Sequence, residues 1–263
     1  MQPEPYIGIT GPVSIKEVED ICKEFSNAEI NMISSHSPML GFLVSYKTLS
    51  NQPTENRRYP LVKELPDLLK ATNYEVLTMI HYNSKEMSTL ADQIAKIFEF
   101  GGVYQDDLCT ALQLNVVWPD IDQVAKIKNQ FPDMQIVFQA SHKATADKTP
   151  EEIAERIKKY GNSLDYVLID PSGGRGIEFD LDSSVALYSE LKKQTPNLRV
   201  GFAGGFTGEN VAPRIKELTK RLGEDNFCID AEGGLRDKIT EAYGDDLLNI
   251  EKVRKYLQAW GSL

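Results

Sequence analysis

The chain has 263 residues, of which 41% are hydrophobic and 26% charged, and this ordinary globular composition excludes a largely disordered protein. Its formal net charge of −10 excludes attraction of nucleic acid or anionic membranes by the overall field, so an anionic ligand has to be held by local donors. The three cysteines are odd in number and far apart, which excludes a disulfide framework and a paired-cysteine metal site and indicates a reduced, cytoplasmic setting. We also expect no export signal and no membrane span, because neither pattern occurs in the sequence.

Eight short apolar runs predict β-strands. In chain order they cover residues 6–10, 39–45, 75–82, 111–117, 134–140, 165–170, 198–203 and 227–231. Most are continuous rather than alternating, which is typical of parallel strands buried on both faces. The intervals between them leave room for one helix after each strand.

Helix signals fill these intervals. Ser14 and Glu17 have the spacing of a capping box at the start of one helix. The segment 149–161 begins with Thr149 and Pro150 and ends on a glycine, the usual order of start and stop residues in a helix.

Strict alternation of strand and helix predicts a parallel sheet, and eight repeats predict that the sheet closes. We therefore expect a single (β/α)8 TIM barrel over residues 1–263, with an open doubly wound sheet as the alternative. The polar segment 47–58 is predicted to be a long loop after the second strand, on the face where such barrels bind ligands.

Glycines concentrate where the last three strands end. Asp170 ends the sixth strand before a glycine-rich loop, Gly204 and Gly205 end the seventh, and Gly233 and Gly234 follow the eighth. Turns of this kind bring backbone N–H groups close to a ligand, and paired turns on neighbouring strands predict a phosphate site. The alternatives are that the glycines only form tight turns and that Asp170 only caps its loop.

These segments carry a resemblance to a known family. IDPSGGRGIEFD, AGGFTGENV and IDAEGGLRD resemble, in order and spacing, the closing third of phosphoribosylanthranilate isomerases. YIGIT, MLGFLVS, RRYP and LQLN resemble the family's first strand, second strand, arginine loop and fourth strand in outline. The resemblance implies a TIM barrel of tryptophan biosynthesis that performs an Amadori-type isomerisation of a phosphosugar, and we expect no cofactor.

The resemblance also implies residue roles. Asp170 falls on the family's general acid, and Arg58 falls on its contact to the anthranilate carboxylate, with neighbouring Arg57 as the alternative. The family's phosphate-binding turns fall on Gly204, Gly205, Gly233 and Gly234.

Two positions depart from the family. Ile7 stands where the family has a cysteine that acts as general base, and an isoleucine transfers no proton. Losing a positioned base typically costs about 10²–10⁴ in rate. The family's serine after strand eight is replaced by Glu232 or Gly233, and a carboxylate beside a phosphate would repel it.

Other side chains are expected at the same end of the barrel. His81 ends the third strand and His142 the fifth, and each is a candidate base because an unperturbed imidazole titrates at about 6.5. A histidine with a purely structural hydrogen bond is the alternative for both. Gly174 and Arg175 are candidate substrate contacts, and Asp230 is expected to support its turn. No HxxxH-type spacing occurs, so we expect no metal.

Three functions remain open. The first is an isomerase-like enzyme with Asp170 as acid and a changed or absent base. The second is a different phosphosugar enzyme, a lyase or epimerase that uses Asp170 with His81 or His142, and the third is a phosphosugar-binding protein without activity. Fold alone does not choose among them. In each case we expect a small-molecule phosphosugar partner, neither nucleic acid nor membrane, and a monomer or homodimer.

Overall fold

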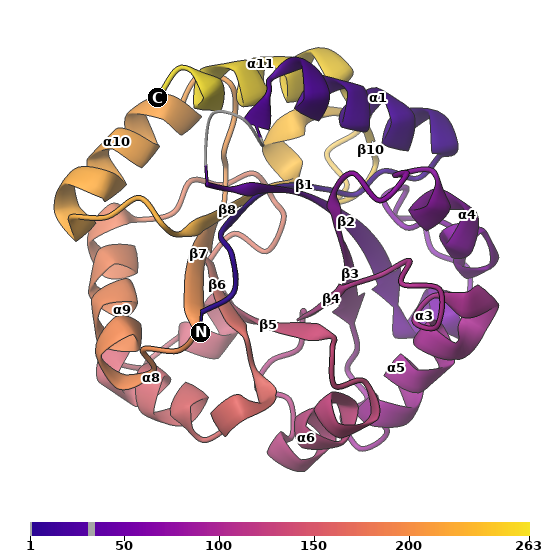
Figure 1. The fold of residues 1–263 in the computed structure, drawn as a ribbon, viewed down its shortest axis with the longest axis horizontal. Coiled ribbons are helices and arrows are strands. Elements are labelled where there is room, and N and C mark those ends of the chain that lie inside the picture. Colours follow the sequence, from indigo (N-terminus) through magenta and orange to yellow (C-terminus); the bar gives the residue numbers. More distant parts are fainter. Residues whose placement is uncertain (1, 31–34) are drawn as a thin grey trace.

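Eight parallel strands close into a barrel in the computed structural model, which describes residues 2–30 and 35–263. Each strand pairs with the next along the chain, and β1 pairs with β8 (Figure 1). The strands are β1 Tyr6–Thr10, β2 Ser37–Ser45, β3 Leu77–Asn83, β4 Ala111–Leu114, β5 Gln135–Ser141, β6 Tyr166–Asp170, β7 Arg199–Ala203 and β8 Cys228–Ala231. The predicted TIM barrel is confirmed, and its closure excludes the open sheet.

Helices surround the strands as an outer ring (Figure 1). They are α1 Ile15–Asn27, α3 Tyr46–Leu49, α4 Leu65–Lys70, α5 Leu90–Glu99, α6 Ile121–Gln130, α7 His142–Thr145, α8 Pro150–Lys158, α9 Leu181–Gln194, α10 Val211–Leu222 and α11 Ile250–Gly261. Within residues 2–30 and 35–263, no helix has both the length and the apolar character needed to cross a membrane.

The predicted helix starts are found with one difference. Thr149 and Glu152 form a reciprocal capping box at the start of α8. Ser14 accepts the backbone N–H of Glu17, but the Glu17 carboxylate accepts the N–H of Val13 rather than that of Ser14. In both helices the side chain of the N-cap residue satisfies one backbone donor of the first helical turn.

The strands separate two apolar layers. Ile7 and Ile9 of β1 belong to the large layer that packs between the strands and the helices. Tyr6 belongs to a smaller cluster inside the barrel, together with Met39, Met79 and Tyr166. Because side chains alternate along a strand, the inward positions of β1 nearest its carboxyl end are Gly8 and Thr10.

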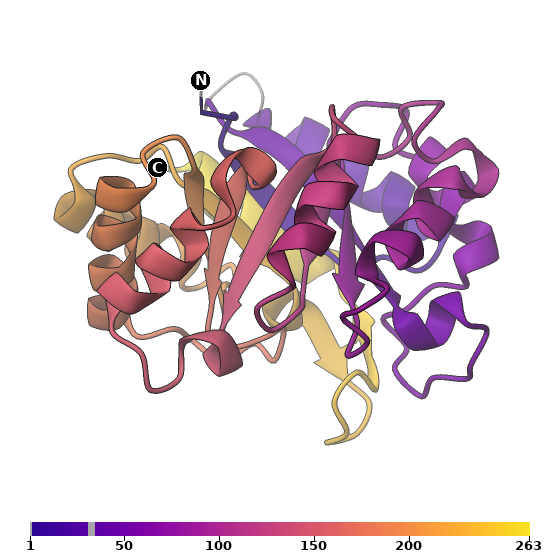
Figure 2. The same ribbon diagram turned by 90° about the horizontal axis from the view of Figure 1, so that it is seen from below.

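A short hairpin stands at the carboxyl end of the barrel, at the bottom of Figure 2. It is formed by β9 Arg236–Lys238 and β10 Asp246–Leu248, which pair antiparallel between β8 and α11. The first residues of the predicted loop 47–58 belong to α3, and the rest of the segment has no helix or strand. In space this segment reaches the hairpin. There the backbone N–H of Arg57 donates to the carbonyl of Gly244 at 2.9 Å.

Candidate functional site

Polar side chains from β3, β4, β5, β6 and β8 or the residues just after them converge at the carboxyl ends of the strands, where ligand sites of such barrels lie. They surround a cavity of about 20 Å³, which has room for about one water molecule. Of the predicted site residues, the cavity brings together His81, Asp170, Gly174, Gly204, Gly205 and Gly233.

Asp170 ends β6 and is buried. Its Oδ1 accepts the backbone N–H groups of Ser172 and Gly173 at 3.0 and 2.9 Å and the Ser172 hydroxyl at 2.8 Å. Its Oδ2 accepts Nε2 of Gln139 at 2.5 Å. One oxygen therefore caps the loop, as the alternative interpretation of the sequence had it, while the other faces the amide of β5.

Asp230 is a second buried carboxyl group of the cavity. The Thr10 hydroxyl donates to its Oδ1 at 3.0 Å. Its backbone lies beside Gly8 of β1, where a Cβ would come within 2.8 Å of the carboxylate. Burial, reinforced by the negative charge of Glu232, raises the pKa of Asp230 well above its ordinary value, so the protonated form is favoured.

His81 is buried and neutral. Burial lowers its pKa to about 3, and its Nδ1 lies 3.2 Å from the amide nitrogen of Gln113. Its Nε2 has no hydrogen-bond partner among the described residues. Gln113 also donates to Asn115 at 2.7 Å, so this side of the cavity presents an imidazole and two amides.

The two predicted glycine turns lie side by side. A Cβ on Gly234 would overlap the carbonyl oxygen of Phe206, the residue that follows Gly205. The loop after β6 covers both turns: a Cβ on Gly205 would lie 2.6 Å from the backbone nitrogen of Glu178, and one on Gly233 would lie 2.6 Å from the carbonyl oxygen of Gly174. The turns converge, but backbone of the protein itself occupies the space in front of them.

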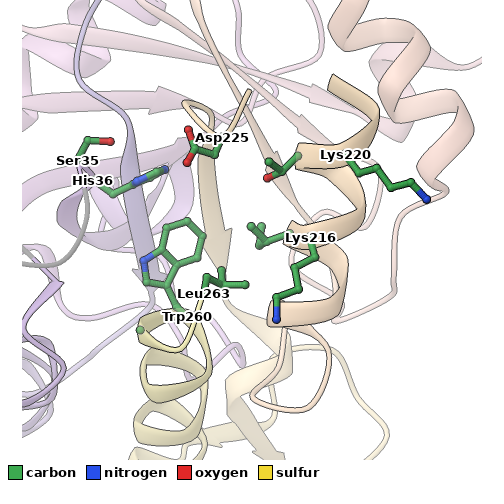
Figure 3. Close-up of a pocket in the computed structure, with 10 residues that line it drawn as sticks. Ser35, His36, Lys216, Lys220, Asp225, Trp260 and Leu263 are labelled. Atoms are coloured by element: carbon green, nitrogen blue, oxygen red, sulfur yellow. The ribbon is translucent and has the colours of Figure 1, made fainter. Parts of the chain in front are cut away.

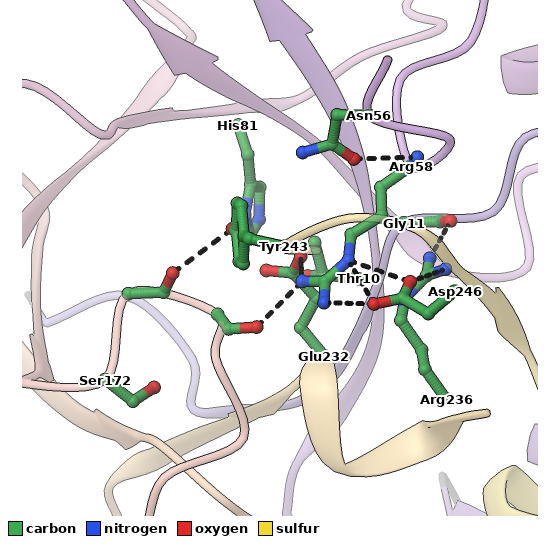
Figure 4. A network of polar contacts seen from close by, with 12 residues as sticks. Thr10, Gly11, Asn56, Arg58, His81, Ser172, Glu232, Arg236, Tyr243 and Asp246 are labelled. Carbon is green, nitrogen blue, oxygen red and sulfur yellow. Dashed lines mark hydrogen bonds and ion pairs between the residues drawn. The ribbon is translucent and has the colours of Figure 1, made fainter. Parts of the chain in front are cut away.

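Arg58 lies at the centre of a buried ion network (Figure 4). Its Nη1 donates to Glu232 at 2.6 Å, and its Nε and Nη2 bond to Asp246. Arg236 also bonds to Asp246 at 3.3 Å, and the Arg58 guanidinium lies 4.7 Å from the ring centre of Tyr243. Arg58 therefore binds carboxylates of the protein at the place where the resemblance implied a ligand carboxylate.

Three other sequence-predicted positions lie outside the cavity. His142 is the exposed first residue of α7, and Arg175 is exposed in the loop after β6. The side chain of Ile7 is fully buried in the outer apolar layer. The inward residue beside Asp230 is Gly8, so this level of β1 contributes no side chain to the cavity.

Several residues of the site were not predicted from the sequence. Gln113 and Gln139 lie in the middle of apolar runs, where a single amide gives no separate signal. Arg236 and Asp246 stand on the hairpin. For Asp230 the sequence predicts support of its turn, and in the structure this residue also lines the cavity.

A larger hollow lies away from this site, between α10, α11 and the start of β2 (Figure 3). Its walls include Trp260, Lys216 and Lys220, and His36 packs edge-on against Trp260 at 4.7 Å between ring centres. None of the predicted site residues lines it. Among the described residues, no group of three or more His, Cys, Asp and Glu side chains is arranged to hold a metal.

The molecule is therefore a (β/α)8-barrel protein with an acid- and amide-lined site at the carboxyl ends of its strands. No family model matches the chain. A curated N-(5'-phosphoribosyl)anthranilate isomerase from Methanoregula boonei is 27% identical over 122 residues, which is 45% of this chain and 57% of that relative's length.

Solved structures also match nearly the whole chain. A phosphoribosyl anthranilate isomerase from Thermus thermophilus shares 15% identity over 98% of each chain, with a TM-score of 0.64. Another, solved in complex with reduced 1-(o-carboxyphenylamino)-1-deoxyribulose 5-phosphate, shares 13% identity over 98% of this chain and 100% of its own, with a TM-score of 0.60. At these identities the likeness to solved structures shows the fold alone.

Proposed function

We propose that this barrel binds a phosphorylated sugar at the carboxyl ends of its strands and isomerises it, with an N-(5'-phosphoribosyl)anthranilate-type compound as substrate. The observation that carries the proposal is the pair of buried carboxyl groups, Asp170 and Asp230, that line one cavity beside the two glycine turns. The curated relative's name and the motif resemblance support the same reaction class.

The reaction needs one proton donor and one proton acceptor. The donor protonates the ribose ring oxygen while the ring C–O bond breaks, and the acceptor removes the C2 proton of the resulting imine. Asp230 is the proposed donor, because its raised pKa keeps the proton on the carboxyl group. Asp170 is the proposed acceptor, because all the groups bonded to its oxygens are N–H and O–H donors.

This assignment differs from the one that the resemblance implies, in which Asp170 is the acid. It also supplies a proton acceptor without a cysteine on β1. His81, which is neutral because burial lowers its pKa to about 3, is the alternative proton acceptor.

The amide groups suit the remainder of such a ligand. Gln113, Asn115 and Gln139 line the cavity between His81 and Asp170. Amide side chains both donate and accept hydrogen bonds, as recognition of sugar hydroxyl groups requires. The glycine turns and Nη1 of Arg58, which contact the same Gly174 carbonyl oxygen, are the proposed phosphate contacts once the loop after β6 moves away from them.

The test is conversion of N-(5'-phosphoribosyl)anthranilate by the purified full chain. We expect turnover, and we expect Asp170→Asn and Asp230→Asn each to lower kcat by about 10²–10⁴. Asp133→Asn is the matched control, because Asp133 is exposed just before β5, at the opposite end of that strand. Binding of ribose 5-phosphate without turnover would instead identify a non-catalytic phosphosugar-binding protein.

The pH dependence separates the two assignments. If Asp230 is the donor, kcat falls as the pH rises through the pKa of Asp230. Asp230→Asn then removes this decrease at high pH from the activity that remains. If the decrease at high pH persists in Asp230→Asn, Asp230 is not the donor.

A further inference from the structure

Glu232 lies among the groups that are proposed to bind an anion. It follows β8 directly and precedes Gly233. Its Oε1 accepts Nη1 of Arg58 at 2.6 Å, and its Oε2 lies 2.5 Å from the position of a Cβ placed on Gly174. The side chain is 14% exposed. A carboxylate of the protein thus lies against both a buried guanidinium and the loop after β6.

The contacts of Arg58 divide into two groups (Figure 4). Nη1 is shared between Glu232 and the carbonyl oxygen of Gly174, at 2.6 and 2.7 Å. Nε and Nη2 bond to Asp246 at distances from 2.5 to 3.2 Å. If Glu232 moved away, Asp246 would still hold the guanidinium in position, with Nη1 pointing into the site.

The loop after β6 depends on the same contacts. Arg58 bonds to the Gly174 carbonyl, and the Tyr243 hydroxyl donates to the Gly173 carbonyl at 3.3 Å. With the loop in this position the cavity has a volume of only about 20 Å³, too small for a phosphate group. A phosphorylated ligand therefore has to separate the loop from Arg58 as it enters.

We propose that Glu232 determines ligand specificity at this subsite, as a resident anion that a ligand phosphate has to displace from Nη1 of Arg58. The inference rests on the proposed phosphosugar site. A phosphate and a carboxylate cannot share one buried guanidinium edge without strong repulsion. A sugar without a charged group does not have to displace Glu232 from Arg58, so Glu232 lowers affinity selectively for the phosphorylated form.

The test is Glu232→Gln, which keeps the size of the side chain and removes its charge. Calorimetric titration at pH 8 and constant ionic strength would give Kd values for inorganic phosphate, ribose 5-phosphate and ribose. We expect both phosphate probes to bind at least about tenfold more tightly to the variant, and ribose affinity to change by less than about twofold. Glu241→Gln is the control, because Glu241 is exposed at the tip of the hairpin.

Unchanged or weaker phosphate binding by a folded Glu232→Gln protein overturns the inference, and so does a complete lack of phosphate binding by both proteins. If Glu232→Gln does not fold, Glu232→Ser takes its place, with the same expectations. The outcome is separable from the proposed function. Tighter phosphate binding without isomerisation supports Glu232 and contradicts the reaction, whereas isomerisation with unchanged phosphate affinity does the reverse.

Discussion

The carboxyl group of Asp230 is buried beside a glycine and a threonine rather than beside a cation. Gly8 leaves the space that the carboxyl group fills, and Thr10 supplies its hydrogen bond. A carboxyl group in such surroundings keeps its proton to a higher pH than it does in the unfolded chain. The raised pKa suits Asp230 for proton donation, but it lowers the stability of the folded protein at neutral pH.

We therefore predict that Asp230→Asn stabilises the protein at pH 7. The folded state retains a proton that the unfolded state loses above about pH 4, so stability is greatest below that pH and falls as the pH rises toward the folded pKa. Asparagine still accepts from Thr10 and carries no charge, and we expect a gain of about 0.5–2 kcal/mol. Urea unfolding of the wild-type and variant proteins at pH 4 and pH 7 measures the gain in unfolding free energy at each pH. A gain that is equal at both pH values would contradict the argument.

His81 has the opposite pH dependence. Its pKa is 6.5 in the unfolded reference and about 3 in the folded protein, so the unfolded state binds the extra proton between these values. Stability from this group is complete above pH 6.5 and is lost toward pH 3, by up to about 1.4 kcal/mol per pH unit. In His81→Asn, whose amide can still bond to Gln113, we expect a shallower loss of stability between pH 6 and 4. An unchanged slope in urea titrations would show that His81 is already accessible to protons.

At the scale of the elements, the loop after β6 lies on the glycine turns and constrains their shape. Gly205 and Gly223 both have left-handed backbone, with φ of 67° and 72°. A Cβ on Gly205 would lie 2.6 Å from the backbone nitrogen of Glu178, whereas a Cβ on Gly223 meets no atom within 4 Å. The pair thus separates the cost of the backbone conformation from the cost of the close approach.

We predict that Gly223→Ala costs about 1 kcal/mol of unfolding free energy, the usual cost of a left-handed alanine. Gly205→Ala should cost at least about 1–2 kcal/mol more, because backbone of the loop after β6 has to shift. Urea unfolding of both variants makes the comparison. Equal losses would mean that the loop is not seated on the turn in solution.

The barrel was predictable from sequence because its strands are local apolar runs and its turns are marked by glycines. Gly205 and Gly233 were found because a glycine pair at a strand end is a local signal. The ion network was not predictable, because Arg58 and Glu232 are 174 positions apart and neither residue signals its partner. The hairpin was missed because each of its strands has three residues, too few to show a periodic pattern.

For the whole molecule, the network around Arg58 joins parts of the chain that the barrel alone would leave separate. It connects the loop after β2, the turn after β8, the hairpin and the loop after β6 through Glu232, Asp246 and Gly174. Arg57, the next residue, makes a different contact: its ion pair with Asp245 leaves 57% of the arginine side chain exposed. Substitutions of these two adjacent arginines therefore compare the stability contribution of a buried ion pair with that of an exposed one.

We predict that Arg58→Met lowers stability by roughly 3–5 kcal/mol, because it leaves the buried carboxylates of Glu232 and Asp246 without their main partner. Arg57→Met should cost less than about 1 kcal/mol, the usual value of an exposed ion pair. Thermal unfolding should show a Tm lower by at least about 6 °C for Arg58→Met and a much smaller shift for Arg57→Met. Similar shifts in the two variants would mean that solvent reaches Arg58 freely, and the closed arrangement of the site would then not describe the molecule in solution.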